Sequence, residues 1–276
     1  MNNDKLFREG QDLLQKVRER KPIVHHITNY VTVNDCANIV LALGGSPIMA
    51  DEICEVEQIV DISDALVLNI GTLNSRTFES MCAAAPHAKE KGIPIVIDAV
   101  GAGATFFRTD SVHQLISIAS PSVIKGNLSE ILSVAGSTSH TAGVDVSQKD
   151  DPDNISKIAD IAHALARKVG CIVAVTGKTD IICDSTHVVT VENGTSRLSQ
   201  ITGTGCMSTS MVATLCGVST SYLTATATAI AVMAIAGETA ESAKGLGTFH
   251  SHLIDAVSVF ESHMLRKRGR LYVREY

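Results

Sequence analysis

Aromatic residues and positive charge are scarce in this sequence. Phe, Trp and Tyr make up 4% of its 276 residues, no Trp occurs, and the formal net charge is -6 at pH 7. Proteins that bind nucleic acid usually concentrate Lys and Arg, and those that bind single strands also stack bases on aromatic rings. The composition therefore argues against nucleic acid as a partner.

Cysteine pairs of the Cys-x-x-Cys kind are also absent. The chain has seven cysteines, an odd number, and their spacing matches no zinc motif. Disulfide frameworks and zinc sites usually show paired cysteines, whereas free thiols persist in a reducing compartment. We therefore predict a cytoplasmic protein with neither a disulfide framework nor a zinc site.

A long apolar segment is missing as well. The run over residues 222–235 is interrupted by threonines and is shorter than a membrane span. Residues 1–5 are mostly polar and do not open a secretory signal peptide. We therefore predict a buried helix at 222–235 and no membrane partner.

Short Val- and Ile-rich runs alternate with amphipathic segments along the first two thirds of the chain. Such alternation is typical of a parallel sheet that helices cover on both faces. We expect an antiparallel pair at 180–184 and 187–191, and mostly helix from 206 to about 267. The predicted strands cover residues 23–27, 46–49, 65–70, 93–98, 122–125 and 171–176, and the predicted helices cover residues 4–20, 32–43, 75–91, 110–119, 128–135 and 155–169.

Neither an internal repeat nor a domain linker is evident. Residues 136–153 are rich in Ser, Thr, Gly and Asp, which is typical of a surface loop. We therefore predict one α/β domain over residues 1–276, in three layers with a mostly parallel central sheet flanked by helices.

Polar clusters follow four of the predicted strands. Ligands of open parallel sheets bind beyond the carboxyl ends of the strands, so these clusters should lie at one edge. Gly71 could meet a small ligand through its backbone, and Thr176 with Gly177 could approach phosphates, although both segments also suit simple turns. The clusters are residues 69–72, 98–105, 125–130 and 175–178.

Two of these clusters carry charge that suits a magnesium nucleotide. Asp98 ends a buried strand before a Gly-rich loop, so it could hold Mg²⁺ or cap the following turn. Lys125, Asn127 and Glu130 also suit a Mg²⁺-nucleotide. Asn127 and Glu130 have, however, the spacing of a capping box at a helix start.

Residues 202–207, Thr-Gly-Thr-Gly-Cys-Met, open the helical C-terminal part. Gly203 and Gly205 allow a sharp turn that exposes backbone amides, and a helix start carries partial positive charge. With Thr204 they form a candidate cradle for a developing anion, and the same field should lower the pKa of the Cys206 thiol. The alternative is an ordinary glycine-rich loop before a buried helix.

Together the clusters indicate phosphoryl transfer. That reaction needs a cation near the phosphates, a carboxylate for metal and an anion cradle close to the acceptor hydroxyl. The Walker pattern Gly-x-x-x-x-Gly-Lys-Ser/Thr is absent, which excludes a P-loop enzyme.

These motifs resemble those of the hydroxyethylthiazole kinase family of the ribokinase-like superfamily. The resemblance covers nearly the whole chain, and the pairing of His26-Ile27-Thr28-Asn29 with Gly203-Thr204-Gly205-Cys206 is its most specific part. The matching segments are residues 24–32, 34–38, 42–50, 68–73, 98–105, 125–130 and 203–206.

The resemblance implies phosphorylation of the hydroxyl of 4-methyl-5-(2-hydroxyethyl)thiazole by ATP with Mg²⁺. It also implies a homotrimer with active sites between subunits, in which Asn29 and Met49 could serve a neighbour's site. The implied roles are thiazole binding for Asn29, Met49, Gly71 and Gly203, ATP binding for Lys125, Asn127, Thr176 and Gly177, and metal binding for Asp98 and Glu130.

Three positions bear on how the chemistry would work. The family often has Pro where this chain has Ala99, and commonly Arg where it has Lys125; Lys keeps the charge but loses the bidentate fork. Related sugar kinases carry an Asp base at the position of Cys206. The thiol could therefore act as a base, orient the alcohol or merely pack against the substrate.

Other functions stay open at this stage. A hydroxymethylpyrimidine kinase or an ATP-dependent hydrate repair enzyme would share the nucleotide site. A thiol enzyme would use Cys206 as its nucleophile and would need a nearby base. A non-catalytic nucleotide-binding regulator would not need an anion cradle aimed at an acceptor.

Overall fold

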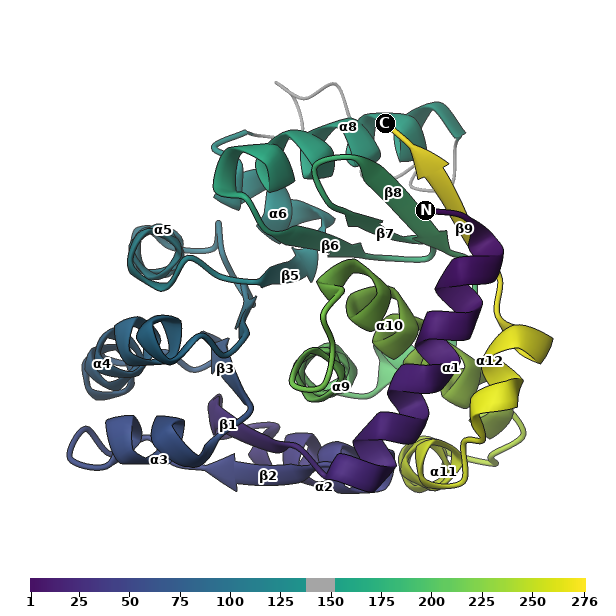
Figure 1. Ribbon diagram of the computed structural model, residues 1–276, viewed down its shortest axis with the longest axis horizontal. Helices are drawn as coiled ribbons and strands as arrows, with labels where there is room; N and C mark the ends of the chain where they lie inside the picture. The colour runs from purple at the N-terminus through teal and green to yellow at the C-terminus, as the bar shows by residue number, and fades with distance from the viewer. Residues whose placement is uncertain (138–151) are drawn as a thin grey trace.

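The computed structural model describes residues 1–137 and 152–276, and the strands in these residues form one mixed sheet (Figure 1). Its order is β2-β1-β3-β4-β5-β6-β7-β8-β9, with parallel pairing from β2 to β6 and antiparallel pairing from β6 to β9. The strands are β1 (Ile23–Ile27), β2 (Ser46–Met49), β3 (Ala65–Asn69), β4 (Ile95–Asp98), β5 (Val123–Asn127), β6 (Ile172–Thr176), β7 (Asp180–Cys183), β8 (His187–Val191) and β9 (Leu271–Glu275).

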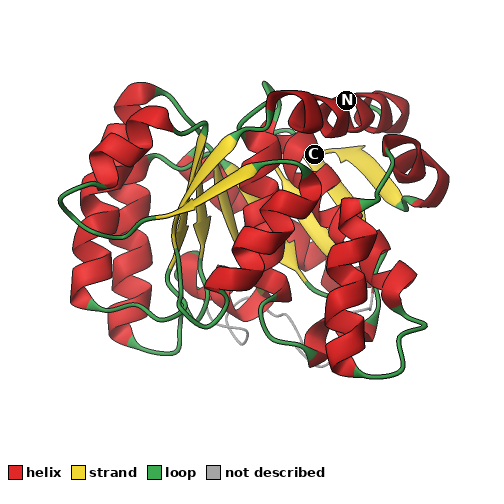
Figure 2. Ribbon diagram, turned by 90° about the horizontal axis from the view of Figure 1, so that it is seen from below, coloured by secondary structure: helices red, strands yellow, loops and turns green. Residues whose placement is uncertain are grey.

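Helices cover both faces of this sheet (Figure 2). One apolar core lies between the sheet and α1, α2, α9, α10 and α11, and a second lies between the sheet and α3, α4, α5, α6 and α8. The helices are α1 (Asn3–Arg20), α2 (Val33–Leu43), α3 (Val56–Ile62), α4 (Ser75–Lys91), α5 (Phe106–Ala119), α6 (Leu128–Val134), α8 (Pro152–Val169), α9 (Thr204–Cys216), α10 (Tyr222–Ala240), α11 (Leu246–Ser258) and α12 (Ser262–Arg268), with a 3-10 helix at Ser196–Gln200. The predicted three-layer α/β architecture is confirmed.

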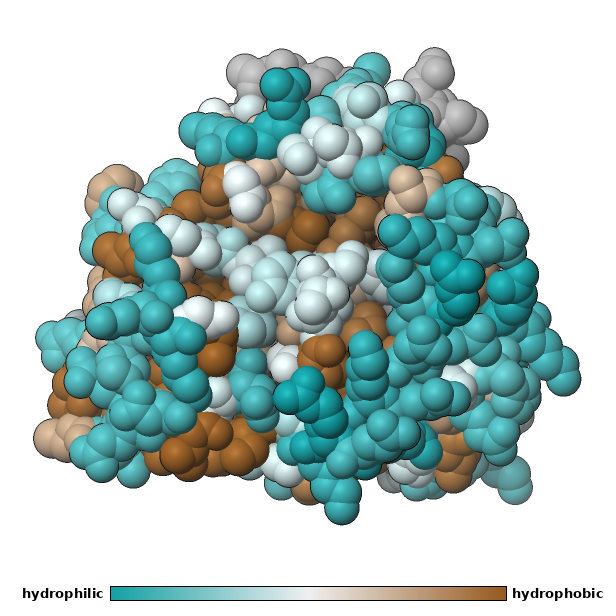
Figure 3. Space-filling model, viewed as in Figure 1, coloured by the Kyte–Doolittle hydropathy of each residue, from teal (hydrophilic) through white to brown (hydrophobic). Residues whose placement is uncertain are grey.

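The burial of each helix follows its sequence pattern. α1 buries Leu6, Leu13, Leu14 and Val17 and turns its polar side outward, where hydrophilic residues cover it (Figure 3). α10 is rich in Ala and Thr, and it is long and apolar enough to cross a membrane. Because 89% of the apolar stretch of α10 is buried inside the protein, α10 is a core helix. This agrees with the prediction made from its interrupting threonines.

Three elements were not predicted from the sequence. α3 is only seven residues long and buries Val56 and Val60, so its periodic signal is weak. β9 depends on pairing with β8, far away in the sequence, and most of its side chains are exposed. The third is the 3-10 helix, in which no residue is buried.

Some predicted boundaries were wrong by a few residues. The strand expected at 93–98 begins at Ile95, and the helix expected at 110–119 begins at Phe106, because the Thr105 side chain caps it by accepting a hydrogen bond from Arg108 N. The loop expected at 136–153 lies largely outside the described residues.

Candidate active site

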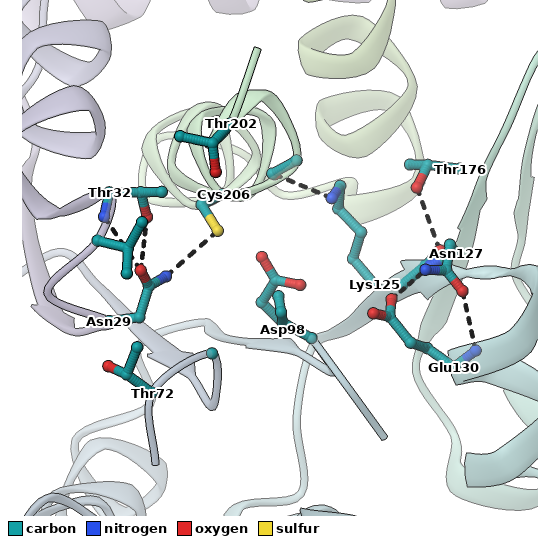
Figure 4. A pocket seen from close by; sticks show the side chains of 16 residues that line it. Asn29, Thr32, Thr72, Asp98, Lys125, Asn127, Glu130, Thr176, Thr202 and Cys206 are labelled. Atoms are coloured by element: carbon teal, nitrogen blue, oxygen red, sulfur yellow. Dashed lines mark hydrogen bonds between the residues drawn. The ribbon is translucent and has the colours of Figure 1, made fainter. Parts of the chain in front are cut away.

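A cavity of about 370 Å³ lies at the carboxyl ends of the parallel strands, beside the first turn of α9 (Figure 4). Strand ends supply it with polar side chains because parallel strands finish at the same edge. Its lining residues are Asn29, Val31, Thr32, Gly71, Thr72, Asp98, Val100, Lys125, Gly126, Asn127, Glu130, Thr176, Thr202, Gly203, Gly205 and Cys206.

The start of α9 forms the cradle that the two glycines predict. Gly203 caps the helix with φ 91°, a left-handed conformation that favours glycine. The first helical hydrogen bond runs from Met207 N to Gly203 O, so the amides of Thr204, Gly205 and Cys206 have no acceptor within the helix. These donors and the helix dipole favour an anion in the cavity.

Glycine at 205 also keeps this cradle open. A β-carbon at this position would meet no atom nearer than Lys125 Nζ, 3.9 Å away. Lys125 is itself buried and donates to Gly205 O at 3.0 Å. The lysine therefore holds the helix start and adds positive charge beside it.

Two asparagines hold the Cys206 thiol. Asn29 Nδ2 and Asn69 Nδ2 donate to Cys206 Sγ at 3.3 and 3.2 Å, and Asn29 Oδ1 accepts from Thr32 N and Oγ1. Burial raises the pKa of the Cys206 thiol, and the charge of Asp98 adds to this rise, while hydrogen bonds from Thr32 and Asn69 and the charge of Lys125 oppose it.

The expected lowering of the Cys206 pKa is therefore wrong. The helix start is present, but the thiol is largely withdrawn from water and faces a carboxylate, and both factors favour its neutral form. Cys206 is thus a neutral thiol near pH 7.

Asp98 is anchored through one of its two oxygens. Oδ2 accepts hydrogen bonds from Asn69 Nδ2 at 3.0 Å and Thr209 Oγ1 at 2.6 Å. Oδ1 accepts none from any residue that the structure describes, and Asp98 points into the space between Cys206 and Lys125 (Figure 4). A carboxylate held in this way has one oxygen available for a cation.

Glu130 lines the same cavity and lies beyond Lys125 as seen from Asp98 (Figure 4). Glu130 Oε2 accepts from Asn127 N and Asn127 Oδ1 accepts from Glu130 N, which completes the capping box of α6. Glu130 Oε1 accepts from Gly101 N at 2.8 Å, so the same side chain fixes the loop after β4. Burial raises its pKa, and the charge of Asp98 adds to the rise.

The residues fit Mg²⁺ by their donor set. Mg²⁺ usually binds one or two carboxylates together with water and substrate phosphates. Asp98 and Glu130 are such a pair, both lining the cavity. Across residues 1–137 and 152–276 no group of three or more His, Cys, Asp or Glu side chains could hold a metal ion.

A second, much smaller hollow adjoins Thr176. Thr176 lines both spaces, whereas Gly177 lines only the second, together with Leu128, Ile155, Ile158, Val175, Lys178, Thr179 and Ile181. Gly177 N donates to Asp180 Oδ1, which holds the turn between β6 and β7.

Most candidate residues therefore meet in one place, with three exceptions. Thr204 is not among the lining residues, and its Oγ1 donates to Leu198 O at 2.9 Å. Gly177 lines only the second hollow, and Met49 ends β2, the strand at the sheet edge, outside the lining of the cavity. Asn29 lines the cavity of its own chain. The sequence analysis assigned no role to the side chains of Asn69 and Thr209. For Asn69 a signal exists, because it ends the strand next to the one that Asp98 ends.

The partners of Cys206 argue against a thiol enzyme. Its hydrogen-bond partners within the described residues are Asn29, Asn69 and Thr32, and no histidine is among them. His26 Nε2 contacts Ser210 Oγ instead, and His25 Nε2 contacts Ala50 O. A nucleophilic cysteine needs an adjacent base or a lowered pKa, and neither is present here.

Known proteins resemble this chain in both sequence and fold. A model of the hydroxyethylthiazole kinase family matches residues 14–262. A hydroxyethylthiazole kinase of Ruminiclostridium cellulolyticum is 49% identical over 262 residues, which cover 94% of this chain and 95% of that protein. The structure of a hydroxyethylthiazole kinase from Pyrococcus horikoshii OT3 superposes with a TM-score of 0.88 at 38% identity, over 98% of this chain and 99% of that one.

More distant structures show the fold alone. A ribokinase-like superfamily protein from Enterococcus faecalis V583 has a TM-score of 0.61 at 11% identity, and covers 90% of this chain and 93% of its own. The predicted ribokinase-like fold is therefore confirmed.

Proposed function

This chain belongs to the hydroxyethylthiazole kinase family, and we propose that its cavity transfers the γ-phosphoryl group of ATP to the primary alcohol of 4-methyl-5-(2-hydroxyethyl)thiazole. One observation carries the proposal beyond family membership. The open amides at the start of α9 face the same cavity as Lys125 and the carboxylate of Asp98. This combination of donors, cation and carboxylate is what phosphoryl transfer requires.

The phosphates of ATP would lie between α9 and the end of β5. The amides of Thr204, Gly205 and Cys206 would stabilise the negative charge that spreads over the transferred group. Lys125 would add a positive charge from a fixed position, because its ammonium is already held by Gly205 O. Loss of one such donor costs roughly 3–4 kcal/mol of transition-state stabilisation in a well-studied case.

Asp98 and Glu130 would hold Mg²⁺ together with the phosphates. Mg²⁺ held by these carboxylates would neutralise the charge of the phosphates. Asp98 is ready for this role because Thr209 and Asn69 occupy one oxygen and leave the other facing the cavity.

The thiazole alcohol would bind beside Cys206, with Asn29, Gly71 and Gly203 around it. A neutral thiol can orient the hydroxyl but does not act as a strong base. A strong base is not required, because the transition state is loose and the alcohol proton can leave late, with the transferred phosphoryl group.

The nucleoside part of ATP would extend toward the small hollow beyond Thr176. Asn127 and Thr176 lie where the two spaces meet, and Gly177 lies in the second. Leu128, Ile158 and Ile181 of this hollow suit a purine face, while Lys125 and the amides of α9 in the first cavity suit the phosphates.

We also propose a cellular compartment and an oligomeric assembly for the protein. We place the protein in the cytoplasm, which is supported by its seven free cysteines and by the burial of α10. A homotrimer with shared sites is the assembly that the family resemblance implies.

The direct test is product formation by the purified protein. We expect ADP release that depends on hydroxyethylthiazole, ATP and Mg²⁺, with the thiazole phosphate identified by its mass. Hydroxymethylpyrimidine and a sugar alcohol serve as competing acceptors. If ATP binds but no acceptor is phosphorylated, the protein is a nucleotide-binding regulator; if only the pyrimidine is, the thiazole assignment is wrong.

A further inference from the structure

The Asn69 side chain is buried behind the wall of the cavity. It is 2% exposed and is not among the lining residues. All of its hydrogen-bonding capacity is nevertheless used. Its Nδ2 donates to Asp98 Oδ2 at 3.0 Å and to Cys206 Sγ at 3.2 Å. Its Oδ1 accepts from Asn29 Nδ2 at 3.0 Å and from Gly71 N at 2.9 Å.

The oxygen and the nitrogen of the Asn69 amide hold different groups in place. The oxygen organises the thiazole side of the cavity, where Asn29 and Gly71 lie. The nitrogen joins the thiol to the carboxylate, which come from elements far apart in the sequence. Because an amide is planar and rigid, it fixes the spacing between the two groups that it joins.

We propose that Asn69 is a positioning residue for phosphoryl transfer, which sets the place of the acceptor alcohol relative to the metal-binding carboxylate. This inference rests on the proposed function. Asn69 touches neither reactant; it acts through Cys206 and Asp98. Partners of this kind, which orient the groups that do the chemistry, typically contribute roughly 10–100-fold to activity.

The chain contains a matched control for such an asparagine. Asn193 is also buried, at 3% exposed, and its Nδ2 donates to the carboxylate of Glu238 at 3.2 Å. Its Oδ1 accepts from a backbone amide, that of Arg270. Asn193 is outside the lining of the cavity. The substitution Asn193→Asp therefore also removes a donor to a carboxylate and adds a negative charge, away from the reaction and beside a carboxylate that Arg268 and Arg270 already pair with.

The first variant is Asn69→Asp, which keeps the acceptor oxygen and loses the donor nitrogen. We expect kcat to fall roughly 10–100-fold while the KM for thiazole changes little, because binding contacts remain and alignment is lost. Asn193→Asp should leave both constants near those of the unmodified protein. Asn69→Ser, which carries no added charge, should lower kcat in the same direction.

A spectroscopic readout separates positioning from general damage. The S–H stretching band of Cys206 is identified in infrared spectra by its loss in Cys206→Ser. Its frequency reports the hydrogen bonds to sulfur, so it should shift in both Asn69 variants and stay in place in Asn193→Asp. Calorimetric binding of thiazole without ATP or metal should be retained in the Asn69 variants.

The outcomes are distinct. Full kcat in either folded Asn69 variant, or an unshifted Cys206 band, overturns the inference. Equal losses of kcat in Asn69→Asp and Asn193→Asp also overturn it, because the effect is then one of stability. If the unmodified protein phosphorylates no thiazole, the proposed function fails first, and the inference fails with it even if the band shifts.

Discussion

At the scale of the residue, the Cys206 thiol departs most from expectation. The helix start that should lower its pKa is present, but burial and the nearby Asp98 carboxylate raise it. The sequence shows which residues flank a helix start and does not show how much water reaches them. Electrostatics at a site therefore require the fold, even where the residues of the site are evident from the sequence.

A carboxylate should replace this thiol without loss of the reaction. Asn29 and Asn69 already direct two N–H donors at position 206, and a carboxylate accepts such bonds more strongly than a thiol. We therefore expect Cys206→Asp to retain substantial turnover of thiazole, measured by mass detection of the phosphate. A folded variant that binds ATP and thiazole and shows no turnover would contradict this expectation.

Asp180 should make folding stability depend on pH. Burial raises its pKa from 3.8 to about 7, against a hydrogen bond from Gly177 N and the charge of Lys125. Between these values the folded state binds more protons than the unfolded state, so the free energy of unfolding contributed by Asp180 falls as pH rises. The difference in free energy of unfolding between Asp180→Asn and the unmodified protein should consequently shift in favour of the variant from pH 5 to pH 8. Urea unfolding at the two pH values measures this difference.

Asp184 serves as a control because its pKa is shifted in the opposite direction. Its burial favours a higher pKa, but hydrogen bonds from Thr186 and His187 outweigh this and lower the pKa. Its contribution to stability is present above its unfolded pKa and is lost as pH falls. Asp184→Asn should therefore be destabilised at pH 8, and parallel pH profiles for the two variants would refute the assignment of Asp180.

At the scale of the element, a side chain at the second residue of α9 should cost activity rather than stability. Gly205→Ala and Gly247→Ala both replace the second residue of a helix, in α9 and α11. Each should raise helix stability by up to about 1 kcal/mol. Only the β-carbon at 205 points toward Lys125, whereas the one at 247 meets nothing within 4 Å.

Activity should therefore separate the two glycine variants. We expect Gly205→Ala to lower kcat at least about tenfold, since the methyl group intrudes on the cradle for the transferred phosphoryl group. Gly247→Ala should be as active as the unmodified protein. Thermal unfolding and steady-state kinetics on both variants test this, and equal activities would show that the cradle is not at Gly205.

The elements near the site were largely predictable for a physical reason. Buried parallel strands are continuous apolar runs, and the polar residue that ends each run marks the edge where ligands bind. Asp98 and Thr176 were found in this way, and each ends its strand as expected. β9 could not be found, because its formation depends on an exposed pairing with β8 rather than on its own pattern.

At the scale of the whole molecule, Met49 poses the remaining question. The family resemblance implies that it contacts the thiazole, yet it lies at the end of the edge strand β2 and outside the cavity of its own chain. Both statements hold together if Met49 reaches the cavity of a second copy. A shared site would also explain why the side chain of Val31, which lines the cavity, is exposed.

Mixed oligomers test this arrangement. We expect the protein to run at three times its monomer mass in light scattering, and Met49→Asp and Lys125→Ala to be weakly active when each is alone. When the two variants are unfolded together and refolded as mixed trimers, some sites combine the intact Met49 of one copy with the intact Lys125 of another. Activity should then rise well above the mean of the two variants. Mixed trimers without such recovery would place Met49 in the site of its own chain or in none.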